Sequence, residues 1–308
     1  MQISASMVKE LRELTGAGMS ACKNALVEAE GNIKRASEIL REKGLAAAAK
    51  KAGRVAAEGL VAAAVAPDRK SGALVEVNSE TDFVAKNDDF ITFVQQMASQ
   101  ALGSTAETTD ALLAEAWKPD PSQTAQEVLT HKISIIGENI GVRRFVRYTA
   151  NANQAVVEYI HGGRVGVILV VEAPAINDSV LEAGRNVCMQ IANLAPQFIS
   201  RADVPAEYLA SEKEILTKQA LEENKTADKP KPEQVIEKMV EGRLAKTLKE
   251  ICLYDQEYVR EDEHTVASYL KSVGEGVKIV AFTRYEKGEG IEKKEVDFAA
   301  EVAEAMNG

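Results

Sequence analysis

The sequence predicts an α+β protein with a helical N-terminal head, and three observations carry this prediction. Two β-hairpin patterns occur in the 308 residues, GLVAAAVAP with ALVEV at 59–77 and AVVEYI with VGVILVVEA at 155–173. Helical periodicity and a further strand pattern follow each hairpin, the strands at 141–149 and 277–285. An alanine-rich basic segment, LAAAAKKAGRVAAEG at 45–59, separates these two units from a purely helical head. Hairpins and helices in this order are typical of α+β folds, here with a core of two similar lobes.

The composition is that of an ordinary globular chain, with 45% hydrophobic and 27% charged residues. Charges interrupt the N-terminal stretch MQISASMVKELREL, and no apolar run reaches membrane-spanning length. The three widely spaced cysteines fit neither a disulfide framework nor a CxxC metal or redox site. We therefore expect a cytoplasmic protein with reduced cysteines and no membrane association.

The net charge of −10 is unevenly distributed, because residues 1–54 carry ten Lys or Arg against six Glu, a net +4, and the remainder carries −14. A basic head on an acidic body is suited to a nucleic acid or to an acidic protein surface. Single-stranded nucleic acid usually stacks on aromatic rings, and the first 82 residues contain no Phe, Tyr or Trp. This disfavours nucleic acid as a partner, although an RNA- or ribosome-binding protein remains the main alternative.

The head, residues 1–54, is predicted to be a bundle of three short helices. Glycines at 16 and 18 end the first helix, Gly31 ends the second, and Asn32 caps a third helix that stops before Gly44. The expected apolar faces are Met7, Val8, Leu11 and Leu14, then Cys22, Ala25, Leu26 and Ala29, then Ile33, Ala36, Ile39 and Leu40. Residues 45–59 have no bulky apolar face and are expected to form a solvated connector, either helical or flexible.

The first core lobe, residues 55–150, opens with a β-hairpin and then turns at the corner SETDF. Asn87 is expected to cap a helix with an apolar stripe through Phe90, Val94, Met97 and Ala101. A second helix is expected at about 124–139, before the strand GVRRFVRYT. No role is assigned to residues 103–123.

The second core lobe, residues 151–287, repeats this order. Its hairpin turns at His161-Gly-Gly-Arg, and helices are expected at about 178–194 and 233–251 before the last strand. An insertion at about 203–245 is expected to form an antiparallel helical hairpin that projects into solvent, around Lys229-Pro-Lys-Pro232. Its seam is thin: Leu209, Ile215, Leu216, Val235, Ile236, Met239 and Val240. An insertion that serves solubility alone is an equal alternative, and no role is assigned to residues 253–265.

Catalytic motifs are missing from the sequence. It has no GxxxxGK[ST] phosphate loop, no GxGxxG after a strand, no GxSxG elbow and no His-x-x-x-His pair. Its three histidines, at 131, 161 and 264, fall in separate predicted elements. We therefore predict no catalytic residues, no metal and no cofactor, and a protein that acts by contact; a metal-free hydrolase is a distant alternative.

Five stretches closely resemble the elongation factor Ts family: LRELTGAGMSACKNAL, EVNSETDFVAKN, IIGENIGVRR, KPKPEQVIEKMVEGR and GEGIEKKEVDFAAEVA. They are spread along nearly the whole chain. The resemblance implies a guanine-nucleotide exchange factor for elongation factor Tu, without direct nucleotide binding. It also implies that the head is ubiquitin-associated-like, that the projecting hairpin is a coiled coil and that residues 288–308 form a C-terminal helical module. A homodimer or a two-plus-two complex with the partner stays open.

The resemblance also assigns partner contacts. Thr81, Asp82, Phe83 and Val84 would meet the partner's G-domain near the magnesium end of its nucleotide site, with Phe83 as a wedge. The other implied contacts are Arg12, Met19 and Lys23 of the head on the G-domain, Ile136 and Gly137 near the phosphate loop, and His161 on another domain. Each has a plainer alternative. Phe83 could share a core stripe with Phe90, Met19 and Ile136 could be core residues, and the remaining charged and turn residues could simply be solvated.

Overall fold

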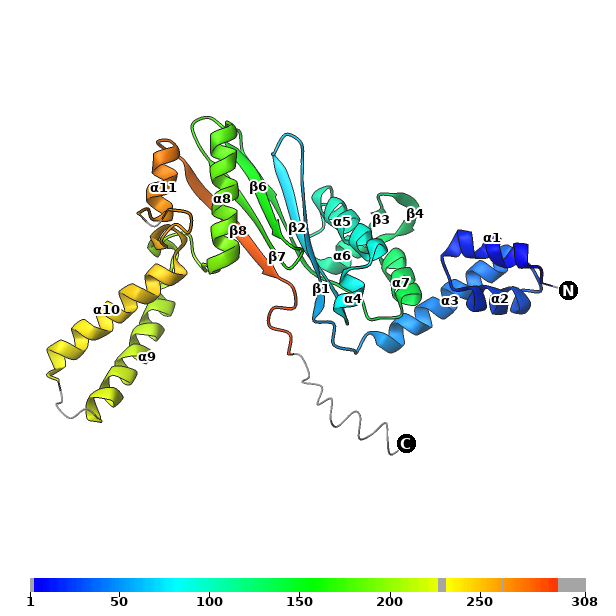
Figure 1. The fold of residues 1–308 in the computed structure, drawn as a ribbon, viewed down its shortest axis with the longest axis horizontal. Coiled ribbons are helices and arrows are strands. Elements are labelled where there is room, and N and C mark those ends of the chain that lie inside the picture. The colour runs from blue at the N-terminus through cyan, green and yellow to red at the C-terminus, as the bar shows by residue number, and fades with distance from the viewer. Residues whose placement is uncertain (1–2, 227–230, 262, 293–308) are drawn as a thin grey trace.

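The computed structural model describes residues 3–226, 231–261 and 263–292, and it confirms an α+β fold with N-terminal helices. Figure 1 shows an elongated molecule, with a helical head at one end, two sheets in the middle and a projecting pair of helices at the other end. Of the predicted C-terminal module at 288–308, residues 293–308 lie outside the described ranges.

The head consists of helices α1 (Ala5–Thr15), α2 (Met19–Glu28) and α3 (Ile33–Lys51). The side chains of Ser4 and Asn32 cap α1 and α3, and Gly16 takes a left-handed conformation, φ 65°, that ends α1. The prediction for Leu14 is wrong, because this side chain is 67% exposed. Six residues at 100° each place it about 120° around the helix from buried Val8. The core of the head is Val8, Leu11, Cys22, Ala25, Leu26, Ala29, Ala36 and Ile39.

The prediction that the third helix stops before Gly44 is also wrong, since α3 continues to Lys51. Gly44 is buried against helix α7 (Ala125–Ile136), where an added Cβ would lie 3.3 Å from the Cβ and Oγ atoms of Ser134. Glycine inside a helix costs about 1 kcal/mol, which this packing between helices can offset. Arg41 of α3 also forms an ion pair with Glu127 of α7. The head is therefore docked on the first lobe through α3, and the connector shrinks to residues 52–57.

Replacing Gly44 with leucine is expected to separate α3 from α7, because a side chain cannot enter the space that Ser134 limits. Amide hydrogen exchange in α7 should become faster while the core strands keep their protection. Gly242→Leu is the matched control, because Gly242 also lies inside a helix but an added Cβ meets nothing within 4 Å. Equal exchange in the two variants would contradict docking through Gly44.

The first lobe contains a sheet in the order β1-β2-β5, formed by β1 (Glu58–Val65), β2 (Ser71–Ser79) and β5 (Gly141–Thr149). Helix α5 (Asp88–Leu102) packs on one face of this sheet, and α7 contributes side chains to the same core. The stripe predicted for α5 is confirmed, because Phe90, Val94, Met97 and Ala101 are all buried. The chain also forms α4 (Asp82–Ala85), α6 (Thr109–Ala114), β3 (Ala116–Trp117) and β4 (Asp120–Thr124). Of these, α6 and β3 lie within the unassigned stretch 103–123, and β4 ends one residue beyond it.

The second lobe repeats the three-stranded sheet, in the order β6-β7-β8. Its elements are β6 (Gln154–His161), β7 (Val165–Glu172), α8 (Asp178–Leu194), α11 (Val266–Val273) and β8 (Lys278–Glu286), with short 3-10 turns at Arg201–Asp203 and Leu253–Asp255. The helix expected at 233–251 is observed with these bounds and forms the second arm of the projecting hairpin. Helix α11, which was not predicted, lies between it and the last strand. The two sheets face each other through Val61, Leu74, Ala150, Val156, Ile168, Val170 and Tyr285.

The projecting hairpin consists of α9 (Ala206–Lys225) and α10 (Glu233–Ile251), and α10 has the bounds expected for the helix at 233–251. The break predicted at 229–232 lies partly outside the described residues. Its seam is narrower than predicted, because Ile215 and Val235 are 46% and 41% exposed. The buried seam is Leu216, Ala220, Ile236 and Val240, with Leu244 packed against it.

A β-bulge in β5 brings two arginines to one buried carboxylate. Glu76 pairs with Arg144 and Val77 pairs with Val142, so Arg143 is the extra residue. The Glu76 side chain is 0% exposed and accepts hydrogen bonds from Arg143 Nη1 at 3.0 Å and Arg144 Nε at 2.6 Å. Gly288 N, just beyond β8, donates a third at 2.7 Å.

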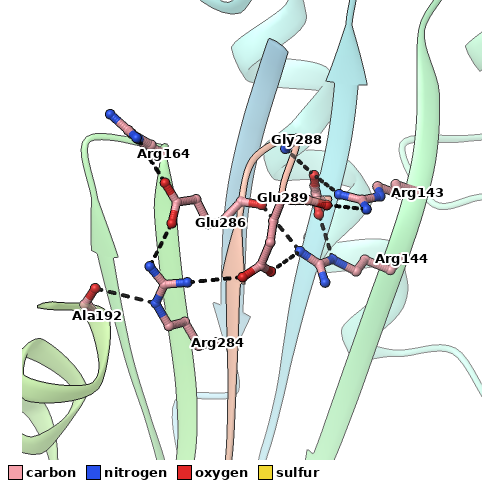
Figure 2. A network of polar contacts seen from close by, with 9 residues as sticks. Arg143, Arg144, Arg164, Ala192, Arg284, Glu286, Gly288 and Glu289 are labelled. Carbon is pink, nitrogen blue, oxygen red and sulfur yellow. Dashed lines mark hydrogen bonds and ion pairs between the residues drawn. The ribbon is translucent and has the colours of Figure 1, made fainter. Parts of the chain in front are cut away.

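Figure 2 shows that this network continues across the lobes, from Arg144 to Glu289 and on to Arg284 and Glu286. Burial alone raises the pKa of Glu76, but the hydrogen bonds from Gly288, Asn78 and the two arginines outweigh burial and hold its pKa below the ordinary value. The ionised carboxylate thus fastens the end of the second lobe to the first.

Candidate functional site

The corner that follows β2 exposes an aromatic side chain on a short, anchored helix. Thr81 is the N-cap of α4, and its hydroxyl accepts a hydrogen bond from Val84 N at 3.4 Å. Val84 is buried in the first-lobe core, whereas Phe83 is 81% exposed. Asn87 caps α5 and separates it from α4, so Phe83 does not share the stripe of Phe90. Phe83 is therefore a surface residue, and the core alternative for it is wrong.

Asp82 lies beside Phe83 with its side chain 50% exposed, and Lys86 one turn later orients it. Lys86 Nζ donates to Asp82 Oδ2 at 2.6 Å and lies 5.9 Å from the centroid of the Phe83 ring. The hydrogen bond from Lys86 is the main reason that the pKa of Asp82 lies below its usual value. An aromatic ring and an ionised carboxylate thus stand together in solvent.

Two glutamates that the sequence analysis did not single out join this corner to the loop after α7. Glu138 accepts from Thr81 N at 2.9 Å and from Thr81 Oγ1 at 2.6 Å. In return, Glu80 accepts from Asn139 N at 2.5 Å and pairs with Arg54 of the connector at 3.6 Å. Both glutamates lie inside the motifs EVNSETDFVAKN and IIGENIGVRR, but only the fold places them opposite each other.

These hydrogen bonds of Glu138 and Glu80, called the clasp below, bring the predicted contact region at 81–84 next to the one at Ile136 and Gly137. Ile136 is the last residue of α7, and Gly137 ends the helix with φ 86°. Gly137 is exposed, while Ile136 is half-buried and packs on the first-lobe core. Ile136 is therefore partly a core residue, as the alternative for it expected, and Gly137 is the more accessible of the two residues.

His161 lies across an apolar groove from the corner. It is exposed at the turn between β6 and β7, where Tyr159 Oη lies 2.8 Å from its Nδ1 atom. In the same turn, the backbone oxygen of Gly163 accepts a hydrogen bond from Val61 N of β1 at 2.7 Å. This bond holds the turn of the second lobe against the first lobe. The groove between corner and turn is lined by Leu60, Ala62, Ala85, Lys86, Ile91 and Ile160.

The predicted contact residues of the head lie apart from these loops, but the head contacts α7, the helix that precedes the Gly137 loop. Arg12, Met19 and Lys23 are exposed, and Met19 retains 59% of its surface, so it is not a core residue of the head. A Cβ on Gly16, between α1 and α2, would lie 3.0 Å from Ile135 Cδ1 of α7. The head therefore touches α7 next to the Ile136 and Gly137 contact region.

The described part of the chain contains no group of three or more His, Cys, Asp or Glu side chains that could hold a metal ion. Among the helices in the same ranges, none is both long and apolar enough to cross a bilayer. The features that stand out on this surface are therefore an exposed aromatic, an apolar groove and two tethered loops, which suit contact with another macromolecule.

Comparison with known proteins agrees with this geometry. The family model described as elongation factor TS matches residues 80–289, which include the corner, the clasp, the His161 turn and the projecting hairpin. The chain is 50% identical to the elongation factor Ts of Clostridioides difficile (strain 630) over 309 residues, covering 99% of each chain. It is 49% identical to the elongation factor Ts of Clostridium acetobutylicum, covering 99% of this chain and 98% of the relative. This protein therefore belongs to the elongation factor Ts family of translation elongation factors.

Proposed function

We propose that this protein is a guanine-nucleotide exchange factor for elongation factor Tu, the GTPase that delivers aminoacyl-tRNA to the ribosome. In this proposal it binds the GDP form, perturbs the magnesium and phosphate site of the partner, and promotes GDP release so that GTP can bind. It performs no covalent chemistry and needs no cofactor, and it acts in the cytoplasm. Family membership supports elongation factor Tu as the partner, and the exposed side chains of the candidate site support an action by direct contact.

The observation that carries the proposal is the 81% exposure of Phe83 on an anchored corner. Exposing a phenylalanine forfeits about 1.5–3 kcal/mol of burial free energy, so a rigid exposed ring is best explained by burial in a partner. A ring that fills a pocket beside a bound Mg²⁺ can displace the groups that support the ion without touching the nucleotide. Asp82, held by Lys86, would face the same region.

The remaining contacts fit a surface that grips the partner on several sides. The head, through Arg12, Met19 and Lys23, would dock on the G-domain, and its net positive charge would steer association. Gly137 would approach the phosphate loop, and His161 would meet a second domain across the apolar groove. Such a grip must favour the nucleotide-free partner, because coupling between two ligands of one protein is reciprocal.

The test is the release of fluorescent GDP from elongation factor Tu with and without the purified protein. We expect release to accelerate, and to depend on the concentration of this protein until the partner is saturated. Calorimetry of the protein alone should show no tight binding of GDP. Unchanged release, or tight GDP binding by this chain alone, would refute the exchange function and would favour the RNA-binding alternative, for which an RNA titration is the direct measurement.

A further inference from the structure

We propose that Glu138 is a positioning residue that locks the Phe83 corner to the Gly137 loop, so that both contacts reach the partner as one rigid unit. This inference deepens the proposed exchange function and rests on it for its kinetic part. Its structural part, the order of the corner in the free protein, can be measured without the partner.

The corner cannot order itself from local interactions. Helix α4 has only four residues, and short helices are unstable in isolation because nucleation is unfavourable. Its N-cap bond, from Val84 N to Thr81 Oγ1, is long at 3.4 Å. The buried side chains of Val84 and Ala85 anchor one side of the turn, which leaves its N-terminal end to be held by other groups.

Glu138 supplies this second anchor from a site distant in the sequence. Its two oxygens accept from the backbone N–H and the hydroxyl of Thr81, 57 residues earlier, at 2.9 and 2.6 Å. A carboxylate that accepts two hydrogen bonds from one residue fixes both its position and its orientation. The adjacent residue pair repeats the link in the other direction, from Asn139 N to Glu80 at 2.5 Å.

The exposed ring depends on this anchor for its direction. Phe83 is 81% exposed, and Lys86 Nζ lies 5.9 Å from its ring centroid. With so little of the ring packed against the protein, the backbone of residues 81–84 sets where the ring points. A preorganised anchor binds more tightly because less conformational entropy is lost on association. The same carboxylate also restrains the loop after Gly137, which places the magnesium and phosphate contacts at a fixed separation.

The first measurement is amide hydrogen exchange of the free protein. Glu138→Ala should accelerate exchange at residues 81–86 by about tenfold or more, while α5 stays protected. The variant lacks the two charge-assisted hydrogen bonds to Thr81, so the equilibrium constant for local opening of this segment rises by about that factor. Thr81→Val, which keeps the side-chain shape but removes the hydroxyl, should act in the same direction. Glu107→Ala, an exposed glutamate of the same lobe, is the control and should change nothing. Wild-type protection at 81–86 in Glu138→Ala overturns the proposal even if nucleotide exchange is stimulated as proposed.

The second measurement is a kinetic cycle with elongation factor Tu. Glu138→Ala should lower kcat/KM for GDP release by about tenfold, and Glu138→Gln should restore most of it because an amide keeps an acceptor for Thr81 N–H. In a Phe83→Ala background, Glu138→Ala should have a smaller effect, because the group that Glu138 positions is gone. The decrease in log kcat/KM should be less than about half of the decrease that Glu138→Ala causes in the wild-type background. Fully multiplicative losses would overturn the positioning role, whereas inactivity of the wild-type protein would refute the exchange function alone.

Discussion

Replacing Phe83 with alanine is expected to leave the protein folded and to abolish most of its stimulation of GDP release. The ring is 81% exposed, so its loss should change the free energy of unfolding by no more than about 0.5 kcal/mol. An aromatic anchor at the centre of an interface typically contributes about 2 kcal/mol or more, which corresponds to a loss of about 30-fold in kcat/KM. A urea titration and a stopped-flow exchange assay on the same variant measure the two quantities.

The matched control is Phe90→Ala, seven residues further along the chain. Phe90 is fully buried in the first-lobe core, so its truncation should cost about 3–5 kcal/mol of stability. The fraction of this variant that remains folded should still stimulate GDP release. A Phe83→Ala protein that unfolds easily but exchanges nucleotide normally would show that the corner has a structural purpose only.

Replacing Glu76 with alanine is expected to destabilise the folded protein strongly. Its carboxylate is fully buried and binds Arg143, Arg144 and Gly288 N. Breaking a buried ion pair typically costs about 3–5 kcal/mol. The two arginine side chains are 29% and 30% exposed and can regain some water, so we expect the lower end of this range, about 3 kcal/mol.

Denaturant titration measures this loss, with Glu214→Ala as the control. Glu214 pairs with Lys218 on the surface of α9, where both side chains are about two-thirds exposed or more, at 67% and 72%. Such an exposed pair contributes at most about 1 kcal/mol. An equal effect of the two substitutions would contradict the role of Glu76 in fastening the lobes.

Acid provides an independent check on Glu76. Its pKa in the folded protein lies below the unfolded value, so its stabilisation is present above the unfolded pKa of about 4.3 and is lost as the pH falls through the folded value. Glu76→Gln mimics the protonated form. The difference in stability between wild type and Glu76→Gln should therefore shrink on acidification, and a difference that grows would show that Glu76 is buried as a neutral acid.

The sequence predicted the elements well where one apolar face meets one local core. The stripe of α5, the two hairpins and the strand at 141–149 were predicted because period and capping residues are local signals. Where another element supplies the stabilising contact, the prediction was wrong. Gly44 should end a helix, but α7 packs against it and α3 continues. Helix α11, between the projecting hairpin and the last strand, was not predicted.

The candidate site divides in the same way. The motifs SETDF and IIGENIG are visible in the sequence, and Asn87 predicts that Phe83 leaves the stripe of Phe90, since a cap between two helical segments separates them. The pairing of Glu138 with Thr81 and of Glu80 with Asn139 spans 57 and 59 residues, and no periodicity encodes contacts at that separation. The sequence by itself determined which side chains are available at this surface. Only the tertiary structure decided that the corner, the Gly137 loop and the His161 turn lie together, because the packing of two sheets through a shared core brings distant turns to one face.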